Sequence, residues 1–334
     1  MKNWSGKIFA VVAAVLMMGM LGESAWAQAK KTPRPALVVL SKDENYLAIV
    51  DPRTLAVVAT VPTGPVPHEV AVSADGKYAV ATNYGAHADG TTLSVIDLDA
   101  QKEIHRVELG ELKGPHGVVF AGNAAWFTAE GAKAAALYSP EKNKIERVVH
   151  TEQERTHMVA LVGRGLGLVT TNVNSDTVSY LPLKTPGEPK ASNLAVGKGP
   201  EGMDVSPDGR ELWVANSGDG SVSIVGLPAW RVLSTIRVET KHSNRLKFTP
   251  DGKRVFISDL GSGELVIVDV AGRKVEKRLK LGKSCEGILM EPGGKRAFVA
   301  VSGDDKVAVV DLQTLEVTKT FAIGKDPDGM AWTR

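Results

Sequence analysis

The sequence predicts an all-β protein, a seven-bladed β-propeller with four antiparallel strands in each blade. Three observations predict this fold. A phrase of alternating apolar and polar residues recurs along the chain, and the final copy of the phrase contains only its first strand. Successive copies are spaced by about 42 residues, and a period of this size with β-strand composition is typical of propeller blades.

The clearest copy of the repeat covers residues 199–236. It reads GPEGMDVSPDGRELWVANSGDGSVSIVGLPAWRVLSTI and contains runs rich in Val, Ile and Trp at period two. The turn sequences PDG and SGDG separate the first three runs. Each copy therefore predicts strands joined by tight turns. Further copies occur at residues 66–85, 114–131, 156–181, 243–270 and 284–312.

The end of the chain predicts how the ring closes. Residues 324–334, GKDPDGMAWTR, correspond to a turn and one strand of a new unit. The remaining strands of that unit correspond to residues 36–61, near the start of the chain. We therefore expect the C-terminal strand to join the N-terminal strands, which removes the sheet edges that an open array would expose.

The first residues predict export. Two lysines precede the uncharged apolar segment IFAVVAAVLMMGML, and SAWAQA then offers a signal peptidase site after Ala27 or Ala29. The apolar segment is shorter than the ~20 residues that span a bilayer, so no stable membrane insertion is expected. We predict a signal peptide at residues 1–29 and a single propeller domain at residues 30–334, in a periplasmic or secreted protein.

The composition excludes some classes of partner. The formal net charge is +2 and aromatic residues make up 5% of the chain, so neither a basic stripe nor a set of stacking platforms for nucleic acid is present. Cys285 is the only cysteine, so no intramolecular disulfide can form. We expect a monomer that binds no nucleic acid.

The repeat resembles a known family. The phrase PDGRELWVANSGDGSVSIV is similar to the YVTN-type repeat of exported bacterial seven-bladed β-propellers, and ATNYG and TTNVNSDTVS carry the same resemblance. The resemblance covers residues 35–334 and implies the fold. That family includes surface-layer and exported binding proteins, and related propellers include lactonases, a carboxymuconate-cyclising enzyme and the haem-binding domain of cd-type nitrite reductases. Fold alone does not choose among these functions.

One ring of polar residues precedes the first strand of each repeat. In a propeller, the segments that lead into the inner strands surround one mouth of the central channel. A solvated rim of loops is the alternative, and in either case replacing His116 should change the melting temperature little because a rim residue buries little surface. The predicted ligand-binding ring consists of His68, His116, His157, Glu201, Asn244, Glu286 and Asp328.

Part of this ring has the residue types of a metal site. His68, His116 and His157 come from three consecutive repeats, and Glu201 comes from the next one. Imidazole and carboxylate ligands suit a divalent ion such as zinc or copper. If no metal is bound, the same histidines can hydrogen-bond an organic ligand.

A second ring lies at the end of the second strand of each repeat. Asn and Asp at such positions commonly cap the following turn through their side-chain oxygens. We therefore interpret this ring as structural. It consists of Ser41, Asn83, Glu130, Asn172, Asn216, Asp259 and Val301.

Two functions fit these observations. The first is an exported binding protein that holds a small molecule, a metal ion or a protein partner at the polar mouth. The alternative is an enzyme of the lactonase, hydrolase or lyase kind, in which Arg245 or a metal stabilises an oxyanion and His157 or Glu201 acts as general base. The sequence contains no CxxCH, GxSxG or HExxH motif that would decide between them.

Overall fold

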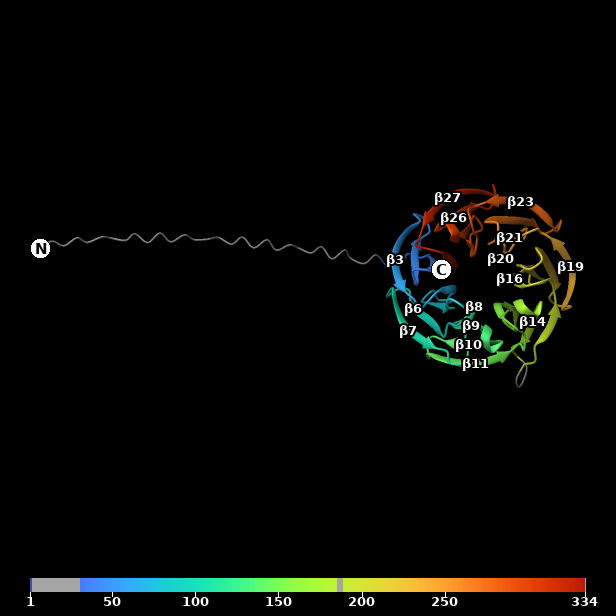
Figure 1. The fold of residues 1–334 in the computed structure, drawn as a ribbon, viewed down its shortest axis with the longest axis horizontal. Coiled ribbons are helices and arrows are strands. Elements are labelled where there is room, and N and C mark those ends of the chain that lie inside the picture. The colour runs from blue at the N-terminus through green and yellow to red at the C-terminus, as the bar shows by residue number, and fades with distance from the viewer. Residues whose placement is uncertain (2–30, 185–188, 334) are drawn as a thin grey trace.

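Seven four-stranded antiparallel sheets form a closed ring around a central channel (Figure 1). The computed structural model describes Met1, residues 31–184 and residues 189–333. This architecture confirms the predicted seven-bladed propeller. The predicted signal peptide lies outside the described residues, so export stays a prediction. Within the described ranges, no helix is long and apolar enough to cross a membrane.

Each blade runs from an inner strand at the channel to an outer strand at the circumference (Figure 1). Blade 1 contains β4 (Pro67–Val72), β5 (Tyr78–Asn83), β6 (Thr92–Asp97) and β7 (Lys102–Glu108). Blade 2 contains β8 (Pro115–Ala121), β9 (Ala124–Ala129), β10 (Ala134–Ser139) and β11 (Lys144–His150). Blade 3 contains β12 (Thr156–Val162), β13 (Gly167–Asn172), β14 (Thr177–Pro182) and β15 (Ser192–Ala195).

The second half of the ring follows the same plan. Blade 4 contains β16 (Pro200–Val205), β17 (Glu211–Asn216), β18 (Ser221–Gly226) and β19 (Arg231–Arg237). Blade 5 contains β20 (Ser243–Phe248), β21 (Arg254–Asp259), β22 (Glu264–Asp269) and β23 (Lys274–Lys280). Blade 6 contains β24 (Ile288–Met290), β25 (Arg296–Val301), β26 (Lys306–Asp311) and β27 (Glu316–Ala322). Single 3-10 turns follow the second strand in three blades: η1 (Glu130–Ala132), η2 (Val173–Ser175) and η3 (Ser302–Asp304).

Blade 7 joins the two ends of the chain. It contains β28 (Pro327–Trp332), β1 (Leu37–Ser41), β2 (Tyr46–Asp51) and β3 (Ala56–Pro62), in that order. β28 and β1 are antiparallel, with Leu37 opposite Trp332 and Val39 opposite Met330. The predicted closure by the C-terminal strand is therefore confirmed.

Apolar side chains between neighbouring blades hold the ring together. Blades 4 and 5 illustrate the contact, because Trp213 of β17 packs edge-on against Phe248 of β20 with 5.6 Å between ring centroids. Trp213 is fully buried, whereas every residue of the outer strand β27 except Phe321 is exposed. The strands nearest the axis are thus fixed on both faces, and they provide rigid walls for the channel.

Candidate functional site

One cavity at a mouth of the channel gathers the whole predicted ring. All seven ring residues line this cavity, which has a volume of about 240 Å³ and is called the histidine cavity below. Lys42, Tyr84, Arg155, His242 and Arg245 also line it. The predicted ligand-binding residues therefore lie together in one cavity.

Bulges in the inner strands aim these residues into the cavity. The sequence analysis placed the ring residues before the inner strands. In the structure, six of them lie within those strands, and Glu286 alone precedes its strand. In β4 the register shifts between Pro67 and Glu69, and in β12 it shifts between Thr156 and Val159. A bulge locally disrupts the two-residue alternation of a strand and re-aims side chains. Comparable shifts occur in β8, β16, β20 and β28.

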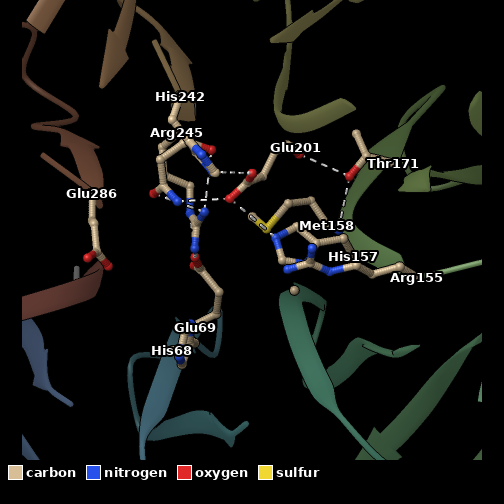
Figure 2. Close-up of polar contacts among 12 residues, drawn as sticks. His68, Glu69, Arg155, His157, Met158, Thr171, Glu201, His242, Arg245 and Glu286 are labelled. Atoms are coloured by element: carbon tan, nitrogen blue, oxygen red, sulfur yellow. Dashed lines mark hydrogen bonds and ion pairs between the residues drawn. The ribbon is translucent and has the colours of Figure 1, made fainter. Parts of the chain in front are cut away.

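Hydroxyl groups of the second strands fix the backbone of the ring residues. The Thr128 hydroxyl accepts a hydrogen bond from the Gly117 amide at 2.8 Å and donates one to the carbonyl of His157 in the next blade at 2.5 Å. The Thr171 hydroxyl likewise donates to the carbonyl of Glu201 at 3.0 Å (Figure 2). The bonds to the carbonyls of His157 and Glu201 cross from one blade to the next, so the ring positions are set by the packing of the blades.

Six of the seven ring residues are buried and His68 is half-buried, which corrects the expectation of a solvated rim. His116 and His157 are each 2% exposed, and Asp328 is 1% exposed. Burial lowers the pKa values of His68 and His116 well below the ordinary value for histidine. The expectation that His116 buries little surface is therefore wrong, because the bulged strands hold its ring inside the channel.

His116 and His157 stack on each other, and His68 is tilted against His116. The ring centroids of His116 and His157 are 3.7 Å apart in a stacked arrangement, and those of His68 and His116 are 5.2 Å apart. Stacked rings direct their nitrogens alongside each other, so the lone pairs do not converge on one ion. Among the described residues, no group of three His, Cys, Asp or Glu side chains could hold a metal ion. The arrangement of His68, His116, His157 and Glu201 does not fit the predicted zinc or copper site.

His157 is oriented by Glu130, which comes from the second ring. The Nδ1–H of His157 donates to Oε1 of Glu130 at 2.5 Å. Tyr84 donates its hydroxyl to the other oxygen of Glu130 at 2.7 Å, and Nε of Arg155 lies 3.4 Å from Oε1. Burial raises the pKa of Glu130, but the contacts with His157, Tyr84 and Arg155 outweigh it, so its pKa lies below the ordinary value. Glu130 is therefore a carboxylate that fixes the His157 ring.

The other nitrogen of His157 faces Glu201 across the cavity (Figure 2). Nε2 of His157 is buried without a hydrogen-bond partner among the described residues, and it lies 3.8 Å from Oε1 of Glu201. Glu201 accepts a hydrogen bond from Asn244 at 2.9 Å and forms an ion pair with His242 at 3.4 Å. Burial raises the pKa of Glu201, but the contacts with His242, His157 and Arg245 lower it to about 2.

A carboxyl-rich cluster occupies the blade 7 side of the cavity. Nζ of Lys42 contacts Glu286 and lies 3.4 Å from Asp326 and 3.7 Å from Asp328. Burial and the neighbouring charge of Asp328 raise the pKa of Glu286 to about 7. Oδ1 of Asp328 is buried without a hydrogen-bond partner in the described part of the chain, although Arg245 lies 3.9 Å away. This side can therefore hold a proton near neutral pH.

A dividing layer closes the channel directly below the histidine cavity. The residue after each ring position alternates between a large side chain and glycine, and the large ones are Glu69, Met158 and Arg245. Nε of Arg245 donates to Glu69 at 2.6 Å across the channel (Figure 2). Arg245 was predicted to face a ligand, and it lines the cavity, but its guanidinium already pairs with Glu69. The glycines of the layer are Gly117, Gly202, Gly287 and Gly329.

Glycine is required in this layer because the inner strands approach closely. A Cβ atom on Gly117 would lie 2.8 Å from the carbonyl oxygen of His157, and one on Gly329 would lie 2.4 Å from that of His68. Both distances are shorter than a normal contact, so any larger residue would push two blades apart.

The second ring is largely structural, but its Asn residues act through their amide nitrogens and not as the predicted oxygen caps, a role that Asp259 fills. The amide of Asn216 donates to Ser221 at 2.9 Å and to Ser223 at 3.0 Å, and Asn83 and Asn172 make equivalent bonds. Asp259 accepts bonds from backbone amides of the adjacent turns. Glu130 is the exception. The sequence did mark Glu130, because Glu stands in FTAEG where other repeats have Asn. The sequence analysis nevertheless interpreted all seven positions of the second ring as caps.

An outer vestibule lies next to the histidine cavity. It has a volume of about 610 Å³, and it shares Tyr84 and Arg155 with the histidine cavity. The insertion GAHADG of blade 1 forms one wall, so His87 lies at the same mouth of the channel. A molecule that enters the cavity from this side passes the Tyr84–Glu130–Arg155 contacts.

Comparison with known proteins supports the fold. No family model and no curated protein matches the chain. A structure described as a putative 6-phosphogluconolactonase from Bacteroides uniformis is 15% identical, with a TM-score of 0.77 over 90% of this chain and 99% of that one. A protein of unknown function from Desulfotomaculum acetoxidans is 15% identical, with a TM-score of 0.74 over the same shares of the two chains. Hydrazine synthase from Kuenenia stuttgartiensis is 17% identical, with a TM-score of 0.67 over 79% of this chain and 89% of that one.

These similarities establish a β-propeller and nothing finer. At 15–17% identity the shared feature is the fold. The resemblance to the YVTN-type repeat stays a resemblance, because no family match accompanies it.

Proposed function

We propose that the protein binds a small polar molecule in the histidine cavity and exchanges a proton with it through His157. The reaction class would be hydrolysis of a lactone or a related ester, or a proton transfer next to a carbonyl group. Binding of a ligand is common to both functions that the sequence suggested, and catalysis adds the step at His157.

The observation that carries this proposal is the pairing of Glu130 with His157. Because Nδ1 of His157 is held by a carboxylate, its tautomer and ring orientation are fixed. The opposite nitrogen, Nε2, then faces the cavity with no hydrogen-bond partner among the described residues. A histidine oriented in this way is the arrangement of a general base that takes a proton from water or substrate.

The electrostatics argue against Glu201 as this base. A general base works best when its pKa lies near the working pH. The pKa of Glu201 is lowered to about 2, so this carboxylate holds a proton too weakly to serve at neutral pH. Glu201 instead offers a fixed negative charge opposite His157.

Arg155 is better placed than Arg245 to meet a developing negative charge. Its side chain is 39% exposed and lines both the histidine cavity and the vestibule. Arg245 is 4% exposed and engaged by Glu69. The names of the lactonase-like neighbours agree with a hydrolytic role, but those names describe the neighbours, and the proposal rests on the site.

The test compares turnover in His157→Gln and the unmodified protein. Glucono-δ-lactone and p-nitrophenyl acetate serve as probes, and thermal shift measures their binding separately. We expect the His157→Gln variant to lose about 100-fold or more in kcat while the lactone still raises its melting temperature. The matched control is His105→Ala, which lies on outer strand β7 and should behave like the unmodified protein.

Each outcome decides between the two functions. Turnover that survives in His157→Gln would remove His157 from the reaction. Binding of the lactone without turnover in the unmodified protein would leave a binding protein and end the catalytic proposal. If neither probe binds and neither reacts, the lactone or ester class is wrong.

A further inference from the structure

A second cavity lies on the other side of the dividing layer. It has a volume of about 350 Å³ and is called the apolar cavity below. Glu69, Met158 and Arg245 line it, and Arg245 also lines the histidine cavity. Its walls come from the lower halves of the inner strands and include Val118, Val119, Ala160, Leu161 and Leu289.

The wall carries one charged pair below the dividing layer. Oδ2 of Asp204 in β16 accepts a hydrogen bond from the amide of Phe248 at 2.9 Å, which fixes the carboxylate. Nζ of Lys247 in β20 lies 3.7 Å from Oδ1 of Asp204, which is beyond hydrogen-bond distance. An ammonium has three donors, and in the described part of the protein none of those on Lys247 forms a hydrogen bond. Lys247 can therefore accept an anionic partner without breaking an existing bond.

The apolar cavity can be reached from the far mouth of the channel. A third cavity of about 450 Å³ lies there and shares Val70, Val118 and Leu289 with the apolar cavity. Phe120 and Trp332 line its wall. A molecule that enters from this mouth follows apolar side chains until it meets Lys247 and the dividing layer.

We propose that the apolar cavity is a second ligand site, which binds an amphipathic monocarboxylate. The carboxylate pairs with Lys247, and the aliphatic chain lies among Val118, Val119 and Leu289 toward the far mouth. Mostly apolar walls with a few placed polar groups are typical of small-molecule sites, whose volumes are roughly 300–1,000 Å³. A carboxylate fits better than an amine because the Lys247 ammonium has all its donors unused among the described residues, whereas one oxygen of Asp204 already accepts the Phe248 amide. This inference does not depend on the reaction at His157.

The experiment measures binding of three eight-carbon probes by isothermal titration calorimetry. Octanoate, 1-octanol and octylamine have the same chain and differ in charge. We expect octanoate to bind about tenfold more tightly than 1-octanol, as one charge-assisted contact provides. Lys247→Met keeps the apolar stem and removes the charge. It should therefore weaken the binding of octanoate by about tenfold and leave the affinity for 1-octanol unchanged.

Two further variants locate the binding. Ala160→Phe fills the apolar cavity, and it should weaken both octanoate and 1-octanol. His157→Gln alters only the histidine cavity, and it should leave octanoate affinity unchanged.

Three results would overturn the proposal. They are an octanoate affinity that Lys247→Met does not change, tighter binding of octylamine than of octanoate, and loss of octanoate binding in His157→Gln. Because the last result implicates the wrong cavity, it distinguishes this site from the one proposed above.

Discussion

The two ends of the channel differ sharply although the same seven inner strands build both. The histidine cavity, of about 240 Å³, is lined almost entirely by polar and charged side chains, whereas the apolar cavity, of about 350 Å³, is lined mostly by Val, Leu, Ile and Met. The two are separated by a single layer of side chains. The difference shows that a few residues along a strand suffice to change the chemistry of a channel.

The bulges account for this difference. Above the dividing layer, the bulge in β12 turns His157 toward one cavity and Met158 into the layer. Below it, the strand pairs regularly again from Val159. A regular strand alternates its faces, so its apolar residues pack between blades and along the channel. The concentration of polar side chains in the histidine cavity therefore accompanies an irregular backbone, whereas the regular part of the strands contributes only two polar side chains, Asp204 and Lys247, to the wall below the layer.

The most severe disruption removes a wall that both ends share. Deletion of residues 326–334 removes β28, the inner strand of blade 7, and leaves β1 without its partner. Because stability in repeat architectures lies in contacts between neighbouring units, we expect insolubility or a large fall in melting temperature. Differential scanning calorimetry would measure it. A deletion that melts like the full chain would contradict the closed ring.

Replacing the dividing layer should have the next largest effect. Arg245→Met leaves the Glu69 carboxylate without its cation and removes one of the two cations beside Asp328, which keeps Lys42; loss of one partner of a buried ion pair costs about 3–5 kcal/mol. Urea denaturation gives the change in free energy of unfolding. The double variant Arg245→Met with Glu69→Gln should recover part of the loss. If the double variant is as unstable as the sum of the single changes, the two residues do not act as a pair.

A smaller loss is expected from the histidine stack. His116→Ala removes a buried ring that contacts His157 at 3.7 Å and Tyr84 at 4.9 Å between centroids. We expect a loss of about 2 kcal/mol in the free energy of unfolding, as for other large-to-small changes in a packed interior. His105→Ala on the outer strand β7 is the control. If His116→Ala leaves the free energy of unfolding unchanged, the original interpretation of His116 as a solvated rim residue would be correct.

The smallest effect distinguishes the two sides of the histidine cavity by pH. The pKa of His116 is lowered below 6.5 in the folded state, so the unfolded state binds the proton first and stability falls as pH drops below 6.5. The pKa of Glu286 is raised from 4.5 to about 7, so its contribution is present below pH 4.5 and is lost as pH rises to about 7. The two slopes therefore oppose each other between pH 4.5 and 6.5.

Matched variants separate the two contributions. In urea denaturation at several pH values, His116→Gln should lose less stability on acidification than the unmodified protein, and Glu286→Gln should lose more. Equal pH dependence in all three proteins would show that neither group titrates differently in the folded state.

The periodic features of the sequence predicted the fold and the placement of the ring. A regular spacing fixes which residues recur at the same point of each blade, so His68 and Asp328 could be assigned to one mouth although they lie far apart in the chain. The unpaired strand at residues 326–332 likewise predicted the pairing of β28 with β1.

Depth and partners were not predictable in the same way. The spacing of the repeats does not show where a strand contains a bulge. The bulge in β8 lies at His116, which is buried and stacked on His157. The partners of the ring come from positions with no repeat signal, such as Lys42 and Arg155. The repeat located Glu130, but we assigned it the capping role of the equivalent residues in other blades. A capping residue and a cavity residue occupy the same position at the end of the second strand, so the repeat does not distinguish them.

The alternation of large and small residues in the dividing layer is limited by the odd number of blades. Seven is an odd number, so a strict alternation around the ring cannot close, and two residues of the same size must be neighbours somewhere; in this chain they are two glycines. They meet at Gly287 and Gly329, where neighbouring blades contribute no side chain to the layer. The same point lies beneath Glu286 and Asp328 and borders the apolar cavity. Because the number of blades is odd, Gly287 and Gly329 form the one place in the layer where two neighbouring blades both contribute backbone alone.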